Sequence, residues 1–87
     1  MTLNQLKYAI AVSESDSFNI AARKLYISQP SLSTSIHALE EEIGIQIFRR
    51  SQNGIAVTPD GKEFLGYARQ VMEQLSFWMP DIYQSQM

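Results

Sequence analysis

A run of short hydroxyl and amide side chains in this 87-residue sequence could form several hydrogen bonds with one ligand. The run contains Gln29, Ser31, Ser33, Thr34 and His37. A glutamine amide donates and accepts together, which matches N7 and N6 of adenine, while serine and threonine hydroxyls bond bases or phosphates. A face that serves only solubility would carry more Lys and Glu. These residue types therefore suit close approach to a duplex; the alternative interpretation is that the serines only cap a helix.

The apolar residues around this run predict a helix over residues 28–43 that turns the polar side chains outward. Four of them share one side of a helix with about 3.6 residues per turn, namely Leu32, Ile36, Leu39 and Ile43. Ser28 can cap the start, Pro30 suits the first turn, and Gly44 can end the helix. The opposite side then presents the polar run, together with Pro30.

Two shorter helices are expected before this one. Thr2 can cap a first helix, which should fade over residues 13–16 because these side chains compete for backbone hydrogen bonds. Its helically spaced apolar residues are Leu3, Leu6 and Ile10. Ser17 can cap a second helix, with Phe18, Ala21, Ala22 and Leu25 directed inward. Tyr26-Ile27 leaves room only for a turn, so the second and third helices form a tightly joined pair.

Two short strands and a long helix are expected in the second half of the chain. The strands are predicted at residues 45–50 and 54–58, with a turn whose strongest signal is Asn53-Gly54. Thr58 and Pro59 can then begin a helix that runs toward Met79, where Pro80 should end or kink it. Its apolar residues alternate at intervals of four and three, namely Phe64, Ala68, Val71, Leu75, Trp78 and Ile82.

The apolar stripe of this last helix has two interpretations: it packs on the domain's own core, or it pairs with a partner. Phe64 and Ala68 can reach the domain. Val71, Leu75 and Trp78 lie farther along the helix, beyond what so small a body can cover, and an exposed apolar stripe marks an interface. We therefore predict that the stripe, Phe64 and Ala68 included, is the interface of a homodimer.

Composition limits the classes of function. A chain with 45% hydrophobic and 18% charged residues is expected to fold. It has no cysteine and one histidine, His37, so neither disulfides nor a metal site are predicted. There is no nucleophile–base motif and no glycine-rich phosphate loop, so we expect no enzyme activity and no cofactor. With no membrane-spanning apolar run and no secretory signal after Met1, the expected location is the cytoplasm.

The net charge of −2 argues against nucleic-acid binding, because isolated DNA-binding domains are usually basic. The distribution is more favourable, since residues 17–39 carry two positive charges and no negative one. Residues 40–42 are three glutamates, which we interpret as a solvated face. Arg49 and Arg50 follow; they either approach a narrow minor groove or protect a strand edge.

The stretch from Ala21 to Ser33, AARKLYISQPSLS, resembles the LysR-type transcriptional regulators of bacteria. The likeness continues, in order, through Ile36, Leu39-Glu40-Glu41-Glu42-Ile43-Gly44, Ile47-Phe48, Arg50 and Val57-Thr58-Pro59. It implies a mainly helical winged helix-turn-helix of three helices and a two-stranded wing at residues 1–58. Residues 59–87 would form a linker helix leading to an effector-binding domain outside this chain. A small-molecule effector is thus expected only there.

The resemblance also implies sequence-specific binding of double-stranded operator DNA by a homodimer, with tetramers in the full-length proteins. Helix 28–43 would enter the major groove with Gln29, Pro30, Ser31 and Ser33 near base edges, and Thr34 and His37 beside them. The wing would turn Arg50 or Asn53 toward the minor groove. From the residue types themselves we also expect Arg49, with the Ser and Thr hydroxyls and helix N-termini, to bond phosphates.

The sequence departs from the family pattern where basic residues are common. Thr34 stands in place of the usual arginine, and His37, Ala38, Asn53 and Ala56 occupy other such positions. Each loss removes a phosphate or guanine contact, so we expect weaker binding that depends more on pairing. Two other functions stay open from the residues alone: a protein-interaction module, which suits the acidic total charge, and a purely structural dimerisation unit.

Overall fold

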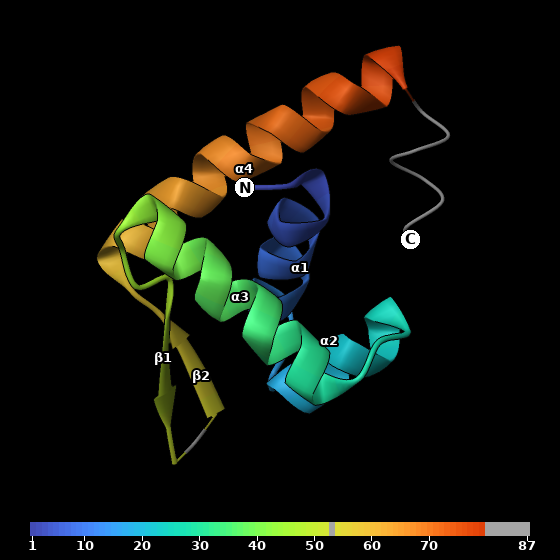
Figure 1. Cartoon of the computed structure of the whole chain (residues 1–87). Helices are drawn as coiled ribbons and strands as arrows, with labels where there is room; N and C mark the ends of the chain where they lie inside the picture. Colours follow the sequence, from blue (N-terminus) through green and yellow to red (C-terminus); the bar gives the residue numbers. More distant parts are fainter. Residues whose placement is uncertain (53, 80–87) are drawn as a thin grey trace.

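The structure is a computed structural model, which describes residues 1–52 and 54–79 of the chain. These residues form four helices and one two-stranded antiparallel sheet (Figure 1). In chain order the elements are α1 (Leu3–Ser13), α2 (Phe18–Leu25), α3 (Gln29–Ile43), β1 (Phe48–Ser51), β2 (Gly54–Val57) and α4 (Pro59–Trp78). The hairpin of β1 and β2 projects from the helices as a wing. The predicted mainly helical winged helix-turn-helix with a long last helix is confirmed.

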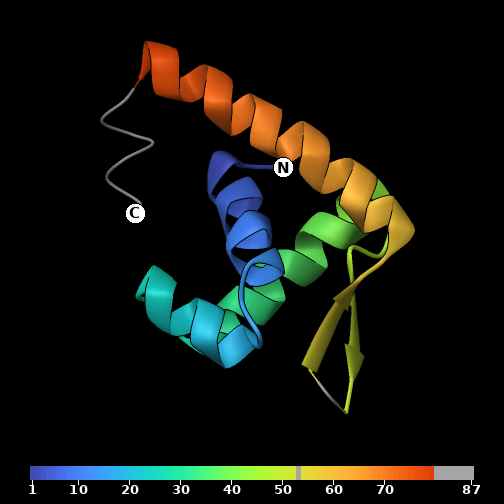
Figure 2. The same ribbon diagram turned by 180° about the vertical axis from the view of Figure 1, so that it is seen from behind.

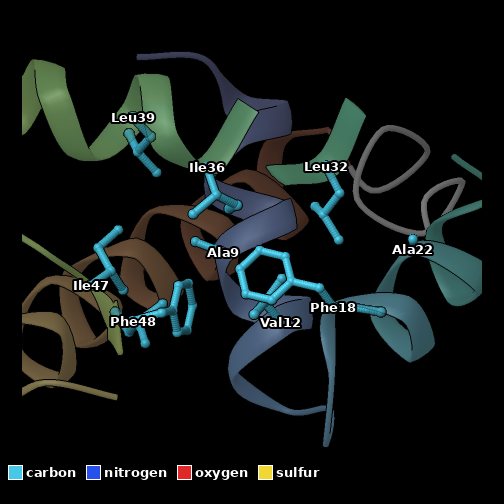
Figure 3. Close-up of a cluster of buried hydrophobic side chains, with 11 residues drawn as sticks. Ala9, Val12, Phe18, Ala22, Leu32, Ile36, Leu39, Ile47 and Phe48 are labelled. Carbon is cyan, nitrogen blue, oxygen red and sulfur yellow. The ribbon is translucent and has the colours of Figure 1, made fainter. Parts of the chain in front are cut away.

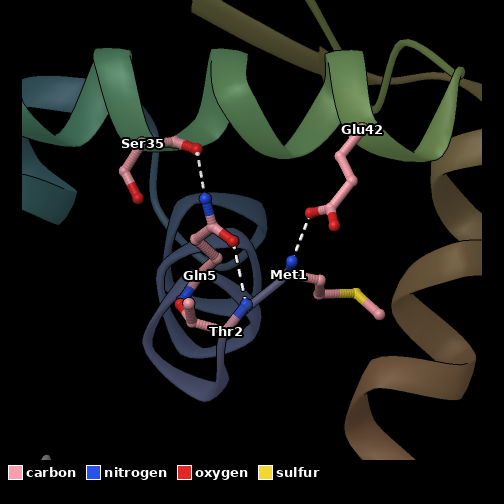
Figure 4. Close-up of polar contacts among 5 residues, drawn as sticks. All are labelled: Met1, Thr2, Gln5, Ser35 and Glu42. Atoms are coloured by element: carbon pink, nitrogen blue, oxygen red, sulfur yellow. Dashed lines mark hydrogen bonds and ion pairs between the residues drawn. The ribbon is translucent and has the colours of Figure 1, made fainter.

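Hydroxyl side chains begin all four helices, as predicted. The N-caps are Thr2, Ser17, Ser28 and Thr58, and each accepts a hydrogen bond from a backbone N–H of the first turn. The cap of α1 is reciprocal, because Thr2 Oγ1 accepts from Gln5 N at 3.0 Å while Gln5 Oε1 accepts from Thr2 N at 2.9 Å (Figure 4). Gly44 ends α3 with a φ of 75°, also as predicted.

The main core lies where α1, α2 and α3 meet the start of the wing (Figure 3). Its largest fully buried side chains are Leu32, Leu39, Ile47, Leu65 and Val12. The predicted inward residues of α3 are buried, except that Ile43 is only half-buried. The prediction for α1 was partly wrong: Leu3 is exposed, and Ala9 and Val12 fill the core because they share the side of the helix that holds Leu6.

A second apolar cluster joins α4 to α1. Leu6 of α1 packs there with Ala68 and Met72 of α4, and Phe64 and Leu75 are half-buried at its edge. The inward side of α4 is made of Gly61, Leu65, Ala68 and Met72. Ala68 belongs both to this inward side and to the apolar stripe seen in the sequence, but the rest of the stripe lies farther around the helix. Leu65 and Met72 are therefore core residues that the sequence analysis missed.

A close backbone contact at its first turn and the polar contacts of Arg69 hold α4 against the rest of the domain. Gly61 lies so close to Ile47 that a Cβ at Gly61 would be 2.3 Å from the Ile47 carbonyl oxygen. Farther along, the Arg69 guanidinium donates to Ser13 Oγ at 3.1 Å and lies 3.8 Å from the Glu14 carboxylate. The last turns of α4 extend past the other helices (Figures 1 and 2). The predicted domain boundary after residue 58 stays a prediction.

The wing is shorter than predicted. Its register runs from Phe48 paired with Val57 to Ser51 paired with Gly54. The predicted first strand began at residue 45, which was wrong because side chains bind the backbone before Phe48: the N–H of Ile47 donates to Glu40 Oε2 at 2.7 Å, and the carbonyl oxygen of Gln46 accepts from Thr58 Oγ1. Asn53, the centre of the predicted turn signal, lies outside the described residues.

The helices of the described part were also tested for length and hydropathy. None of them is both long and apolar enough to cross a membrane.

Candidate nucleic-acid interface

The polar run of α3 lies on the side of the helix opposite the core. Pro30, Ser31, Thr34 and His37 are exposed, and Gln29 and Ser33 are half-buried. This placement follows from the burial of Leu32, Ile36 and Leu39 on the inner side, since a helix repeats its faces about every 3.6 residues. The side chains that the sequence singled out for hydrogen bonding therefore share one accessible surface.

A groove of about 510 Å³ separates this surface from the wing. Its lining comes from three parts of the chain: Phe18 of α2; Ser33, Thr34, Ile36, His37 and Glu40 of α3; and Gln46, Phe48 and Arg50 of the wing and its approach. Hydroxyls and an imidazole line one wall and a guanidinium stands on the other. Phe18 and Gln46 were not among the predicted site residues, because only the tertiary fold brings them here.

Arg50 is held in this groove by two contacts from different helices. Its guanidinium carbon lies 4.4 Å from the centre of the Phe18 ring, and its Nη2 donates to Ser33 Oγ at 3.0 Å. The Phe18 ring meets the Phe48 ring edge-on, with centroids 6.0 Å apart (Figure 3). A cation above an aromatic face is attracted by about 0.5–1 kcal/mol at an exposed site. The Arg50 side chain thus joins the wing to α3 and α2.

Ser33 also bonds within its own helix. Gln29 Nε2 donates to Ser33 Oγ at 2.7 Å, one turn along α3. Gln29, Ser33 and Arg50, all predicted DNA contacts, therefore form one hydrogen-bonded chain. At the start of the helix, Ser28 Oγ accepts from Ser31 N at 3.2 Å and donates to Ser31 Oγ at 2.8 Å, so part of the serine content does serve capping, as the alternative interpretation proposed.

The other predicted DNA-contacting residues of the wing are Arg49 and Asn53. Side chains alternate along a strand, so Arg49 points to the face opposite Phe48 and Arg50, and it is exposed. Asn53, predicted near the minor groove, lies outside the described residues.

The three glutamates at the end of α3 are not simply a solvated face, which corrects the prediction. Glu40 is half-buried, and its Oε2 accepts from the backbone N–H groups of Ile47 at 2.7 Å and Phe48 at 3.1 Å. Glu41 lies 3.1 Å from Nε2 of His37, and Glu42 pairs with the N-terminal ammonium group (Figure 4). Each carboxylate therefore has a hydrogen-bond or ion-pair partner inside the chain.

Gln5 supports α3 from behind, on the side away from the groove. Its Nε2 donates to the carbonyl oxygen of Ser35 at 3.4 Å, and the same side chain closes the cap of α1 (Figure 4). Among the described residues, no group of three or more His, Asp or Glu side chains could hold a metal ion.

Comparison with known proteins identifies the family. Residues 3–62 match the bacterial regulatory helix-turn-helix proteins of the lysR family. This chain belongs to the LysR family. It is 46% identical over 72 residues to the HTH-type transcriptional regulator TfdT of Cupriavidus pinatubonensis, covering 83% of this chain and 32% of TfdT. It is 44% identical over 75 residues to the regulator BenM of Acinetobacter baylyi, covering 86% of this chain and 25% of BenM. The chain thus spans a third or less of these relatives.

Solved structures of LysR DNA-binding domains have the same fold. The complex of the BenM DNA-binding domain with catB site 1 DNA superposes with a TM-score of 0.87 at 39% identity, covering 97% of this chain and 94% of that one. The complex of the CbnR DNA-binding domain with DNA gives 0.84 at 38% identity, covering 98% and 97%. The chain is therefore the helix-turn-helix DNA-binding domain of a LysR-type transcriptional regulator. The expectation that it is not an enzyme is confirmed by this family membership.

Proposed function

We propose that this LysR-family domain binds double-stranded operator DNA as a symmetric dimer, with α3 in the major groove and the wing near the adjacent minor groove. One observation carries the proposal: the polar residues of α3 form one accessible surface, and Arg50 of the wing stands beside it. The major groove of B-DNA, about 12 Å wide, admits an α-helix. The DNA complexes of the BenM and CbnR domains, which resemble the chain over nearly its whole length, support the DNA binding in this proposal.

Bases and phosphates would be bound by different side chains. Gln29, Ser33 and Thr34 would contact base edges, with Pro30, Ser31 and His37 close to them. Phosphates would be bound by hydroxyls, by the N-terminus of α3 and by Arg49, since backbone N–H groups and cations both attract anions. Arg50 and Asn53 would lie nearest the minor groove. Because bacterial chromosomal DNA lies in the cytoplasm, this function implies that location.

The second copy would bind along α4. Val71 is 43% exposed and Trp78 is 82% exposed, although both are large and apolar. Tyr67 lies on the same side of the helix, and the half-buried Leu75 and Phe64 extend the surface toward the core. Ala68 is only 2% exposed because Leu6 of the same chain covers it, so it would support this interface from within.

The pairing of two such surfaces would remove the apolar side chains from water, which favours association. Assembly beyond a dimer and any small-molecule effector would depend on the remainder of the regulator. The 72 and 75 aligned residues make up 32% and 25% of these relatives, which are therefore about 2.6 and 3.4 times as long as this chain.

Selection of bound sequences from a random duplex pool tests the proposal. A symmetric dimer should enrich two half-sites in inverted orientation, with centres about one helical turn, or a multiple of it, apart. Affinity for the selected duplex should fall steeply as salt rises, because phosphate contacts release counterions. No enrichment, together with affinity that is insensitive to salt, would favour a protein-interaction module instead.

A further inference from the structure

We propose that Arg50 is a positioning residue that presets Gln29 to read adenine, acting through Ser33 rather than through its own contact with a base. This inference rests on the proposed function and assigns the base that one residue of α3 prefers. The observation behind it is the unbroken hydrogen-bonded chain from the wing to the start of α3, through Arg50, Ser33 and Gln29.

The first step is the fixed position of Arg50. Its guanidinium has Phe18 on one face, and Phe18 is only 9% exposed and is itself held by the buried Phe48. A planar guanidinium that stacks on an aromatic ring keeps its N–H groups in defined directions. One of these directions ends at Ser33 Oγ, 3.0 Å away. The contact with the buried Phe18 therefore limits the directions from which the exposed Arg50 side chain can donate to Ser33.

The second step is the valence of the Ser33 hydroxyl. A serine hydroxyl has one hydrogen to donate and two lone pairs to accept with. Arg50 Nη2 and Gln29 Nε2 both donate to this oxygen, at 3.0 and 2.7 Å, so both lone pairs are used. Ser33 can then act toward DNA only as a donor, which suits an acceptor such as a phosphate oxygen or a purine N7.

The third step is the orientation of the Gln29 amide. One Nε2 hydrogen is bonded to Ser33, which leaves the second hydrogen and the Oε1 acceptor available. Adenine presents an acceptor at N7 and a donor at N6 in the major groove, whereas guanine presents two acceptors, N7 and O6. An amide with one free donor and one free acceptor matches adenine and mismatches guanine. Were the bond to Ser33 lost, the amide could rotate and its preference would weaken.

The test compares Arg50→Lys with Arg49→Lys in the whole chain. Both variants keep the charge of the wing, but a lysine at position 50 cannot keep the planar stack on Phe18 with the bond to Ser33. Selection from random duplexes, followed by titration of duplexes with A·T or G·C at the pair that Gln29 reads, measures the preference for adenine. We expect Arg50→Lys to reduce that preference by about tenfold, since a good bidentate pair supplies discrimination of this order.

Arg49→Lys changes a proposed phosphate contact, so it should change affinity for the A·T and G·C duplexes by the same factor and leave their ratio as it is. Ser33→Ala should reduce the preference for adenine as much as Arg50→Lys does. The double variant with Arg50→Lys and Ser33→Ala should lose no more of the preference for adenine than Ser33→Ala alone, because both residues act through the same series of hydrogen bonds. The side-chain amide protons of Gln29, followed by NMR in the free protein, should shift in Arg50→Lys and not in Arg49→Lys. That readout holds even when DNA binding is weak.

An equal loss of affinity at every base pair in Arg50→Lys would show that Arg50 is a phosphate anchor, and would overturn the inference. Unchanged Gln29 amide signals in that variant would overturn it as well. If the unmodified chain itself enriches no sequence, the proposed function fails first, which is a separate and recognisable result.

Discussion

Gly61 of α4 rests directly on the backbone of Ile47, with room for no side chain between them. A Cβ built at Gly61 would lie 2.3 Å from the carbonyl oxygen of Ile47 and 2.9 Å from its Cα. Real Cβ atoms do not approach backbone atoms so closely, so the first turn of α4 can pack on the approach to the wing only with glycine at position 61. The contact joins the long helix to the DNA-binding body.

Gly61→Ala is therefore expected to destabilise the fold, by about 2 kcal/mol, because overpacking at a rigid site forces a backbone shift. The matched control is Gly66→Ala in the same helix, where a Cβ would meet nothing within 4 Å. That control should stabilise the helix slightly, by up to about 1 kcal/mol. Urea unfolding followed by circular dichroism measures both changes, and equal stability of the two variants would contradict this account of the packing.

Glu40→Ala is expected to cost about 2 kcal/mol of unfolding free energy. The Glu40 carboxylate accepts two backbone N–H groups, those of Ile47 and Phe48, and its loss would leave them without this partner. Glu41→Ala, one residue away and exposed, should change stability by less than about 0.5 kcal/mol. Thermal unfolding of both variants tests the difference. An equally large loss of stability in Glu41→Ala would show that the stability depends on the total charge and not on the hydrogen bonds of Glu40.

Gln29→Ala should weaken binding to the selected duplex by about 1–3 kcal/mol and leave binding to a scrambled duplex nearly unchanged. The reason is that a base contact carries sequence preference, while phosphate contacts do not. Asn4→Ala is the control, because it removes an exposed amide from α1. Fluorescence anisotropy with the two duplexes gives both numbers, and an equal loss on both would mean that Gln29 does not read a base.

Val71→Arg should abolish the proposed dimer and lower affinity for a two-half-site duplex, while a single half-site is bound as before. A charge at a buried apolar contact costs several kcal/mol, but Val71 is 43% exposed in the single chain, so its fold should persist. Gly66→Arg supplies the same charge elsewhere on α4, with open space for its Cβ, and should leave assembly intact. Sedimentation equilibrium decides between these outcomes. A dimeric Val71→Arg chain would place the interface elsewhere.

The starts of the helices could be predicted because a cap is a local feature. Thr2, Ser17, Ser28 and Thr58 each bond a backbone N–H within three residues, so spacing along the chain is sufficient to find them. The outward turn of the polar run on α3 could be predicted for the same reason, since the spacing of Leu32 and Ile36 determines both sides of one helix.

Contacts between distant elements could not be predicted in this way. The strand beginning at residue 48 depends on Glu40, and the groove depends on Phe18 and Arg50, which are far apart in the sequence. In α4 the spacing revealed a stripe but not its rotation: the alternation includes Val71, whereas burial selects Leu65 and Met72. Both stripes are apolar, and only the contact with Leu6 decides which one faces inward.

Because α4 is long, a small change of angle at its first turn displaces its last turn by several ångströms. Its 20 residues measure about 30 Å from Pro59 to Trp78 at roughly 1.5 Å per residue. Trp78 lies about 25 Å along the helix from Gly61, so a tilt of about 8° where Gly61 meets Ile47 would move the far end by about 3.5 Å, close to the rise of one base pair. A dimer joined at that far end would convert such a tilt into a change in the distance between its two DNA-reading helices. A substitution well away from the duplex could therefore change which operator spacing is bound.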